Sequence, residues 1–496
     1  MVNVGVSFFL APFVVNTLGS TRYGLWAVTM QFTGYLYLLD FGVRESVIRY
    51  TSKYMARNHG ARLNRILTVA FGVYGPITLL TLVVTGVFVW QAPHLLDYDA
   101  SYDAEARWAI AFVGMTIAQT FIFNVFTGIV LGLQRWSTVN ASNVVLALAR
   151  TLAIVIALKA GYGIAAMAAI QFIAGTLSGL FVWFLAARYL RQAGATIRMV
   201  AMTWRRFRAL ATRVFRYGLF VFLSNIGQKI IVASDALIIA AFLPIASVTY
   251  FAIAGSLIDS LRSLLGSSSQ VFAPIASRLH TTGDRQQLGT LLVQGSKFIL
   301  LLAIPVAGTF AVLGDIFIGL WMGRQFMGPA GEVLMVLAIS TLLSAPTYTM
   351  GMVLYGISRH NLNAYLKIGE AVANLGLSLF LVQRLGILGV AVGTAVPQAV
   401  VCVFILPYVT CRAVGLSYSS YMWRTVTGPA LAAVPFLLAE LWIRHNVEFT
   451  SLLTFFGSIA ALCVVYGGLV FYLALESSER SWALAVIRRR PPAQAG

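Results

Sequence analysis

Charged residues are scarce in this chain. Asp, Glu, Lys and Arg make up only 10% of its 496 residues, whereas about a quarter of an average soluble protein is charged. Hydrophobic residue types make up 59%, and apolar segments of about 20 residues, long enough to cross a bilayer core, recur almost from end to end. These features exclude an ordinary soluble globular fold and predict an all-α polytopic membrane protein.

Residues that bind metals or form disulfides are also few. Cysteine occurs three times, at Cys402, Cys411 and Cys463, without a pairing pattern or metal-like spacing. The five histidines fall in expected loops or at helix ends, and none forms a ligand pair. Nucleotide-binding and nucleophile motifs are missing as well. The sequence therefore predicts no metal, no cofactor and no enzymatic activity.

The apolar segments predict about 14 transmembrane helices. The first lacks the basic start and small-residue cleavage site of a signal peptide, so we interpret it as a membrane helix. The sequence leaves open whether residues precede Met1. The expected spans are 2–18, 23–43, 66–90, 108–133, 139–158, 163–187, 215–241, 245–277, 295–320, 330–356, 361–382, 386–411, 422–443 and 451–475.

The two halves of the chain repeat each other. GIVLGLQRWSTVNA from Gly128 parallels GMVLYGISRHNLNA from Gly351, and Pro76 corresponds to Pro305. Because six helices separate equivalent positions, the repeat predicts two parallel six-helix lobes related by an axis along the membrane normal, around a central cavity. The expected parts are a lobe at 1–187, an Arg-rich cytoplasmic linker at 188–214, a second lobe at 215–412, and two extra helices with a cytoplasmic tail at 413–496.

Basic residues are distributed unevenly between the expected loops. The 44–65 segment and the linker are rich in arginine, whereas the 91–107 loop carries four carboxylates. Since Lys and Arg concentrate on the cytoplasmic side, this asymmetry predicts that both termini are cytoplasmic. The net charge of +19 then reflects topology and attraction to membrane lipid headgroups, and we expect no nucleic-acid partner.

Seven charged residues fall inside the expected helices. A charge at the bilayer centre costs about 2.5 to 3.5 kcal/mol on insertion scales, so these side chains should face water or each other. They are Arg150, Lys229, Asp235, Asp259, Arg262, Lys367 and Glu370.

Some of these charged residues belong to rows of polar residues that run along one face of a helix. In the 361–382 helix, polar residues follow at intervals of three or four, which places them on one face. Comparable faces on three other helices predict a hydrated cavity between the lobes. Arg150 and Lys229 have no carboxylate three or four residues away, so they are the strongest candidates for an anionic substrate. The stripe of the 361–382 helix consists of Asn363, Lys367, Glu370, Asn374 and Ser378.

Two roles are predicted for these residues. Basic and amide groups would bind a substrate with phosphate and sugar parts, and carboxylates would carry a coupling proton or sodium ion. A structural alternative is that Asp259 pairs with Arg262, and Lys367 with Glu370, within their own helices. Asp40 could likewise pair with Arg44. The predicted substrate-binding residues are Arg44, Arg49, Arg150, Lys229, Arg262, Lys367, Asn363 and Asn374, and the predicted ion-coupling residues are Asp235, Asp259 and Glu370.

The beginning of the chain resembles a known family. The run LGSTRYGLWAVTMQFTGYLYLLDFGVRESVIRYTSKYMA at 18–56 is similar to the start of Wzx-type oligosaccharide flippases, within the multidrug/oligosaccharidyl-lipid/polysaccharide exporter superfamily. The tandem repeat with two extra helices resembles the fourteen-helix form of that group. The family's cavities are typically basic, which suits the lysines and arginines above, whereas three carboxylates in the same helices depart from that pattern.

The resemblance implies a specific function. Alternating access would move an undecaprenyl-pyrophosphate-linked oligosaccharide across the bacterial inner membrane, for assembly of O-antigen, capsule or exopolysaccharide. A polysaccharide polymerase would be an expected partner.

Two alternatives remain open at this point. A cation-coupled multidrug exporter of the same superfamily should have twelve helices and an acid-dominated cavity. A membrane polysaccharide polymerase or ligase should have a large external loop with catalytic groups. The triplet Asp97-Tyr98-Asp99 formally matches a metal-binding Asp-x-Asp motif, but we expect it outside the cell, away from nucleotide sugars.

Overall fold

The computed structural model describes residues 2–57, 59–96, 98–357, 359–475 and 479–480. Side chains at 2–9, 33, 35, 38, 136, 216–233, 360, 361, 363 and 364 lie outside this description. The chain forms two compact units, residues 1–252 and 253–496. The predicted lobe boundaries stay a prediction.

Within the described residues, every regular element is a helix. In the part of the chain that the structure describes, ten helical segments are long and apolar enough to cross a membrane. The predicted all-α polytopic membrane fold is therefore confirmed, while the count of fourteen spans stays a prediction.

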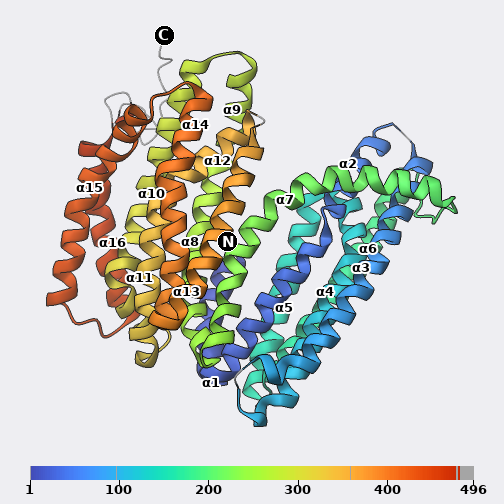
Figure 1. Cartoon of the computed structure of the whole chain (residues 1–496), viewed down its shortest axis with the longest axis horizontal. Coiled ribbons are helices and arrows are strands. Elements are labelled where there is room, and N and C mark those ends of the chain that lie inside the picture. The colour runs from blue at the N-terminus through green and yellow to red at the C-terminus, as the bar shows by residue number, and fades with distance from the viewer. Residues whose placement is uncertain (1, 58, 97, 358, 476–478, 481–496) are drawn as a thin grey trace. The chain divides into compact units, whose positions relative to one another are not determined.

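The first unit contains seven α-helices and two short 3₁₀ helices before the chain enters α8 (Figure 1). The range labelled α1 holds two helical limbs, which correspond to the first two expected spans. They meet at Gly19, whose φ 78° and ψ 167° are non-helical, a backbone conformation that glycine tolerates readily. The elements are α1 Val2–Leu36, η1 Tyr37–Asp40, α2 Val43–Met55, α3 Gly60–Leu95, η2 Ala100–Tyr102, α4 Asp103–Gly132, α5 Trp136–Lys159, α6 Ile164–Gln192 and α7 Trp204–Phe242.

Small residues allow the helices of this unit to approach closely. Gly114 of α4 faces Thr85 of α3, and Gly179 of α6 faces the ring of Phe123 of α4. Inside a bilayer, helices associate through van der Waals packing of this kind, because lipid is as apolar as the side chains. The α3, α4 and α6 helices therefore form the packed centre of the first unit.

The second unit begins within α8 and contains the remaining helices. The expected span 245–277 is divided into α8 and α9, and the span 330–356 into α11 and α12, which begins at Pro346. The elements are α8 Ala246–Ser269, α9 Phe272–Thr281, α10 Arg285–Trp321, η3 Arg324–Phe326, α11 Met327–Ser344, α12 Pro346–Gly356, α13 His360–Val400, η4 Val401–Ile405, α14 Leu406–Val414, α15 Tyr418–Asn446, α16 Leu452–Leu469 and η5 Val470–Ala474.

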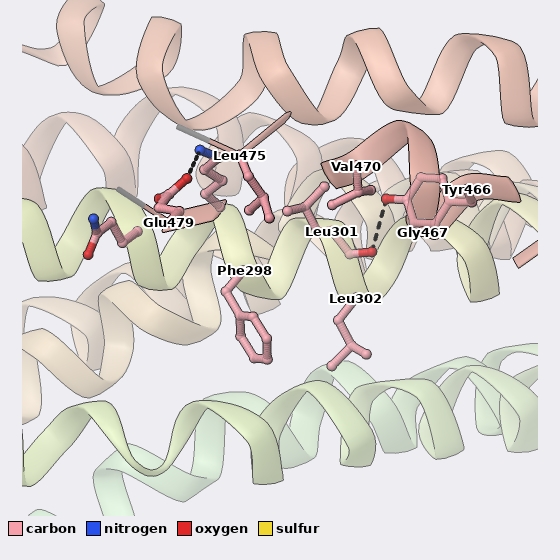
Figure 2. A pocket seen from close by; sticks show the side chains of 10 residues that line it. Phe298, Leu301, Leu302, Tyr466, Gly467, Val470, Leu475 and Glu479 are labelled. Carbon is pink, nitrogen blue, oxygen red and sulfur yellow. Dashed lines mark hydrogen bonds and ion pairs between the residues drawn. The ribbon is translucent and has the colours of Figure 1, made fainter. Parts of the chain in front are cut away.

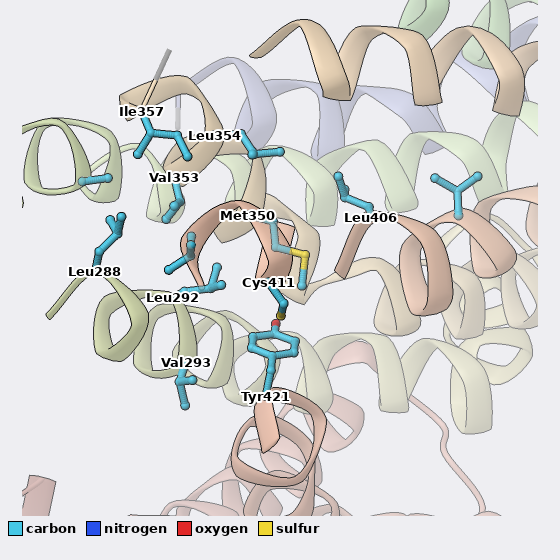
Figure 3. Packing of buried hydrophobic residues seen from close by; sticks show 13 residues of the cluster. Leu288, Leu292, Val293, Met350, Val353, Leu354, Ile357, Leu406, Cys411 and Tyr421 are labelled. Carbon is cyan, nitrogen blue, oxygen red and sulfur yellow. The ribbon is translucent and has the colours of Figure 1, made fainter. Parts of the chain in front are cut away.

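The buried core of the second unit joins helices that are distant in the sequence. Figure 3 shows one cluster, in which Leu292 of α10, Met350 of α12, Cys411 of α14 and Tyr421 of α15 lie together. A second cluster joins α8 and α10 to Phe436 of α15 and Tyr466 of α16 in the same way. The two C-terminal helices are therefore packed against α10 and are an integral part of this unit.

Helix α13 is a helical hairpin. Gly386 has φ 58° and ψ −136° and reverses the chain between two limbs. The limbs touch through glycines of the second limb, since a Cβ at Gly389 would collide with the carbonyl of Leu381, and one at Gly393 with Ser378. This close contact fixes the first limb, which carries the predicted polar stripe.

The variant Gly389→Ala is expected to lower the thermal stability of the purified protein in detergent. Its added methyl would meet a backbone carbonyl, which cannot rotate away, and overpacking of this kind costs about 1 to 3 kcal/mol. Gly376→Ala is the matched control, because Gly376 lies in the same helix with nothing within 4 Å of an added Cβ. Equal melting temperatures of the two variants would contradict the close contact.

Candidate functional site

The described part of the predicted polar stripe of α13 is buried at Glu370, Asn374 and Ser378 and half-buried at Lys367, and it is internally bonded. Lys367 Nζ donates to both oxygens of Glu370, at 3.1 and 2.8 Å, and Glu370 is only 3% exposed. One turn further, Asn374 Nδ2 donates to Thr394 Oγ1 at 2.7 Å. The alternative of a pair within the helix is thus confirmed for Lys367 and Glu370. The side chain of Asn363 lies outside the described residues.

The polar stripe continues on residues that the sequence analysis missed. Gln398, one turn after Thr394 on the second limb, accepts from Ser340 Oγ at 3.0 Å and donates to Ser344 Oγ at 3.1 Å. These serines belong to α11. The sequence did contain an indication of this continuation. Thr394 and Gln398 are four residues apart on the expected 386–411 helix, and that spacing places both on one helix face.

Helix α8 contributes a second pair of opposite charges. Arg262 Nη1 lies 3.5 Å from Asp259 Oδ1. The arginine side chain is 19% exposed and the aspartate side chain 56% exposed, so the pair lies at a partly open face of the helix. The alternative of pairing within the helix is confirmed here too.

The charges of α8 and α13 act on a common region. The thiol of Cys402 lies within electrostatic range of Lys367, Glu370 and Arg262. The ring hydroxyl of Tyr348 lies within range of Arg262, Asp259 and Cys402. The predicted charges of the second unit among the described side chains are thus two cations and two anions, which form two separate pairs and balance in charge.

Arg150 differs from these paired groups. It lies on α5, is half-buried, and has no hydrogen bond or ion pair among the described residues of its own unit. Asp235 is buried on α7 at 4% exposure. The side chain of Lys229 lies outside the described residues.

A different cluster occupies the end of α1. Asp40 accepts from Tyr74 Oη at 2.5 Å and from Asn124 Nδ2 at 3.3 Å, so it joins η1 to α3 and α4. The ion pair of Arg44 is with Glu45, at 2.9 Å. The predicted pairing of Asp40 with Arg44 was wrong, because two uncharged donors from other helices reach Asp40. Arg49 is exposed on α2.

The Asp-x-Asp triplet has a local structural role. Asp99 caps η2 by accepting from the backbone N–H of Ser101 at 2.7 Å, and this hydrogen bond lowers the pKa of Asp99. Burial and a hydrogen bond to Asp103 raise the pKa of Tyr98 to about 12. Asp97 lies outside the described residues. Asp99 is thus engaged as a helix cap.

Comparison with known proteins identifies the family. Residues 1–280 match the family model described as polysaccharide biosynthesis protein. The chain belongs to this family. A putative O-antigen transporter of Shigella flexneri is 20% identical over 389 residues, 77% of this chain and 88% of the relative. A probable low-salt glycan biosynthesis flippase of Haloferax volcanii is 26% identical over 227 residues, about half of each chain (46% and 48%).

Solved structures share the fold of this polysaccharide biosynthesis protein. The lipid II flippase MurJ in an inward closed conformation superimposes with a TM-score of 0.70 at 12% identity, covering 95% of this chain and 97% of that one. An inward-facing multidrug resistance MATE family transporter of the MOP superfamily gives 0.61 at 16% identity, covering 84% and 98%. The predicted family is therefore confirmed by the family model, and these structures confirm the fold.

The chain also contains buried charged residues that were not predicted as site residues from the sequence. Glu440 of α15 is fully buried and lies 2.5 Å from Thr309 Oγ1 of α10. Lys297 of α10 pairs with Glu479 at 2.7 Å. Glu440 and Lys297 lie within three residues of the ends of their expected spans, 422–443 and 295–320, where charge is inexpensive, so their positions gave no signal.

Proposed function

We propose that this protein is a flippase that moves a polyprenyl-pyrophosphate-linked oligosaccharide across the bacterial cytoplasmic membrane, for assembly of a surface polysaccharide. The proposal is supported by the family match and by the names of two relatives, a putative O-antigen transporter and a probable glycan biosynthesis flippase. Both termini would be cytoplasmic, and a polysaccharide polymerase would receive the transported glycan.

The observation that carries this proposal is that one predicted cation has no counter-ion, whereas two predicted carboxylates each have one. Arg150 has no counter-ion within the described residues of its unit, whereas Asp259 and Glu370 are each paired with a base on their own helix. An arginine in a membrane helix without a carboxylate is suited to a pyrophosphate, which its planar fork can bind through two hydrogen bonds. A cationic drug would instead have to displace Lys367 or Arg262 from a carboxylate.

The paired charges suggest how an ion gradient could drive transport. If a proton or sodium ion binds Glu370, Lys367 loses its counter-ion and becomes available to the pyrophosphate. In α8, an ion bound to Asp259 would likewise release Arg262. Asp235 in α7 is a further carboxylate that could bind the ion. Alternating access would then couple ion binding to glycan movement.

The experiment that tests the proposal is reconstitution of the full chain in vesicles that contain a fluorescent polyprenyl-pyrophosphate oligosaccharide in both leaflets. Quenching by a membrane-impermeant reagent measures exchange between the leaflets, and vesicles without protein are the control. We expect protein-dependent exchange that is unaffected by an excess of cationic drug. Drug uptake without lipid exchange would favour the multidrug exporter instead.

A further inference from the structure

A cavity of about 730 Å³ lies in the second unit, between α10, α16, η5 and the two residues Leu475 and Glu479 (Figure 2). Phe298, Leu301 and Leu302 of α10 line one side, and Gly467 and Val470 line the other. Phe298 is 54% exposed, so the cavity opens at the surface of the unit. Its volume is in the range of cavities that hold one small organic ligand, about 300 to 1,000 Å³.

One end of this cavity carries both signs of charge. Lys297 Nζ lies 2.7 Å from Glu479 Oε2, and their side chains are 6% and 17% exposed. Gln294, nearly one turn before Lys297, adds an amide. At the other end, the hydroxyl of Tyr466 already donates to the carbonyl of Leu301 at 3.0 Å. The charged groups of this otherwise apolar chamber therefore lie at one end, where Figure 2 shows Glu479, and Tyr466 lies at the other.

The position of the ion pair along α10 matches the headgroup region of a bilayer. Helix α10 has 37 residues, about 55 Å at 1.5 Å per residue, whereas the hydrocarbon core is about 30 Å thick. Lys297 lies about 18 Å from the start of α10, close to where the core begins on that side. From the distribution of basic residues we expect this side to be cytoplasmic.

We propose that this cavity binds one phospholipid of the cytoplasmic leaflet with a phosphoethanolamine headgroup. Lys297 would bind the phosphate, Glu479 the primary ammonium, and the chamber beside Leu301 and Val470 one acyl chain. A headgroup that carries both charges satisfies each member of the pair when it inserts, so neither buried ion is left without a partner. An anionic glycerol headgroup leaves Glu479 uncompensated, and a choline headgroup has no N–H to donate.

This inference is independent of the transported substrate. A polyprenyl pyrophosphate carries negative charge and no ammonium, so it matches Lys297 but is repelled by Glu479. The bound phospholipid would instead contact both Lys297 of α10 and Glu479 and stabilise the folded unit, as any ligand of the native state does.

The test measures lipid binding to the full-length protein in detergent. Native mass spectrometry with phosphatidylethanolamine, phosphatidylcholine and phosphatidylglycerol of identical acyl chains gives relative affinities. We expect phosphatidylethanolamine to bind about tenfold more tightly than either other lipid, which corresponds to one charge-assisted contact. Glu479→Gln should remove the preference over phosphatidylcholine. Arg285→Gln, which removes an exposed charge from the start of α10, should leave it unchanged.

Two neighbouring glycines provide a test variant and its matched control for binding of the acyl chain in the cavity. Gly467 lines the cavity, and an added Cβ there meets nothing within 4 Å, as is also true of Gly468. Gly467→Phe should therefore fill the chamber and reduce phosphatidylethanolamine binding at least tenfold. Gly468→Phe should bind like wild type, because Gly468 does not line the cavity and successive side chains of a helix point in different directions.

Three outcomes would overturn the proposal. One is equal affinity for the three lipids in wild type. Another is unchanged binding in Gly467→Phe, which would place the lipid elsewhere. The third is displacement of phosphatidylethanolamine by an equimolar polyprenyl phosphate, which would assign the cavity to the substrate chain. None of these depends on transport, so failure of the proposed flippase function would leave this test intact.

Discussion

The variant Arg150→Ala is expected to reduce glycan export about 30- to 140-fold, and lipid-linked precursor should accumulate on the cytoplasmic side. The expected factor corresponds to loss of a hydrogen bond to a charged group, about 2 to 3 kcal/mol. Arg150 has no partner in the described residues of its unit, so its removal leaves no buried carboxylate uncompensated. The loss should therefore appear in transport while the amount of inserted protein stays normal.

Two further variants distinguish phosphate binding from a packing role. Arg150→Lys keeps the charge but removes the bidentate geometry, so partial export is expected. Arg107→Ala is the matched control, because Arg107 also lies in a membrane helix but pairs with Asp103 at 2.9 Å. Export is measured by surface glycan staining, and precursor by lipid extraction. Wild-type export in Arg150→Ala would remove Arg150 from the site, and equal loss in Arg107→Ala would indicate a general defect.

Helical periodicity predicted those parts of the site that lie on single helices. The spacing of Lys367, Glu370 and Asn374 placed them on one face, and the structure buries that face. Hydrophobic length likewise predicted the membrane fold, because a helix must satisfy its own backbone groups in lipid. The non-helical residue that separates the two limbs of α1, Gly19, likewise lies between the helices expected at 2–18 and 23–43.

Partners from distant helices could not be predicted in this way. Asp40 bonds to Tyr74 and Asn124, which are 34 and 84 positions away, and Lys297 bonds to Glu479, 182 positions away. No local spacing encodes such pairs, since they depend on which helices pack together. Opposite charge favoured Arg44 as the partner of Asp40, but Asp40 instead accepts hydrogen bonds from the uncharged side chains of Tyr74 and Asn124 on neighbouring helices.

The second large effect is expected from Glu370→Gln, which should abolish the dependence of transport on an ion gradient. In wild type, Glu370 holds Lys367 through two contacts, at 3.1 and 2.8 Å, so Lys367 is available to substrate only after a cation neutralises the carboxylate. A glutamine is neutral at all times and still offers an oxygen to Lys367. Exchange between leaflets should therefore persist without a gradient, while accumulation against a gradient of substrate should be lost.

The reciprocal variant and a control make this prediction specific. Lys367→Gln should weaken substrate binding by about tenfold while leaving the dependence on the gradient in place, since the lysine is assigned to the substrate and the carboxylate to the ion. Asp103→Asn breaks an exposed pair with Arg107 and should change neither. Transport is measured in vesicles with the proton or sodium gradient collapsed separately, which also identifies the ion. A Glu370→Gln protein that still requires the gradient would move the coupling role to Asp259 or Asp235.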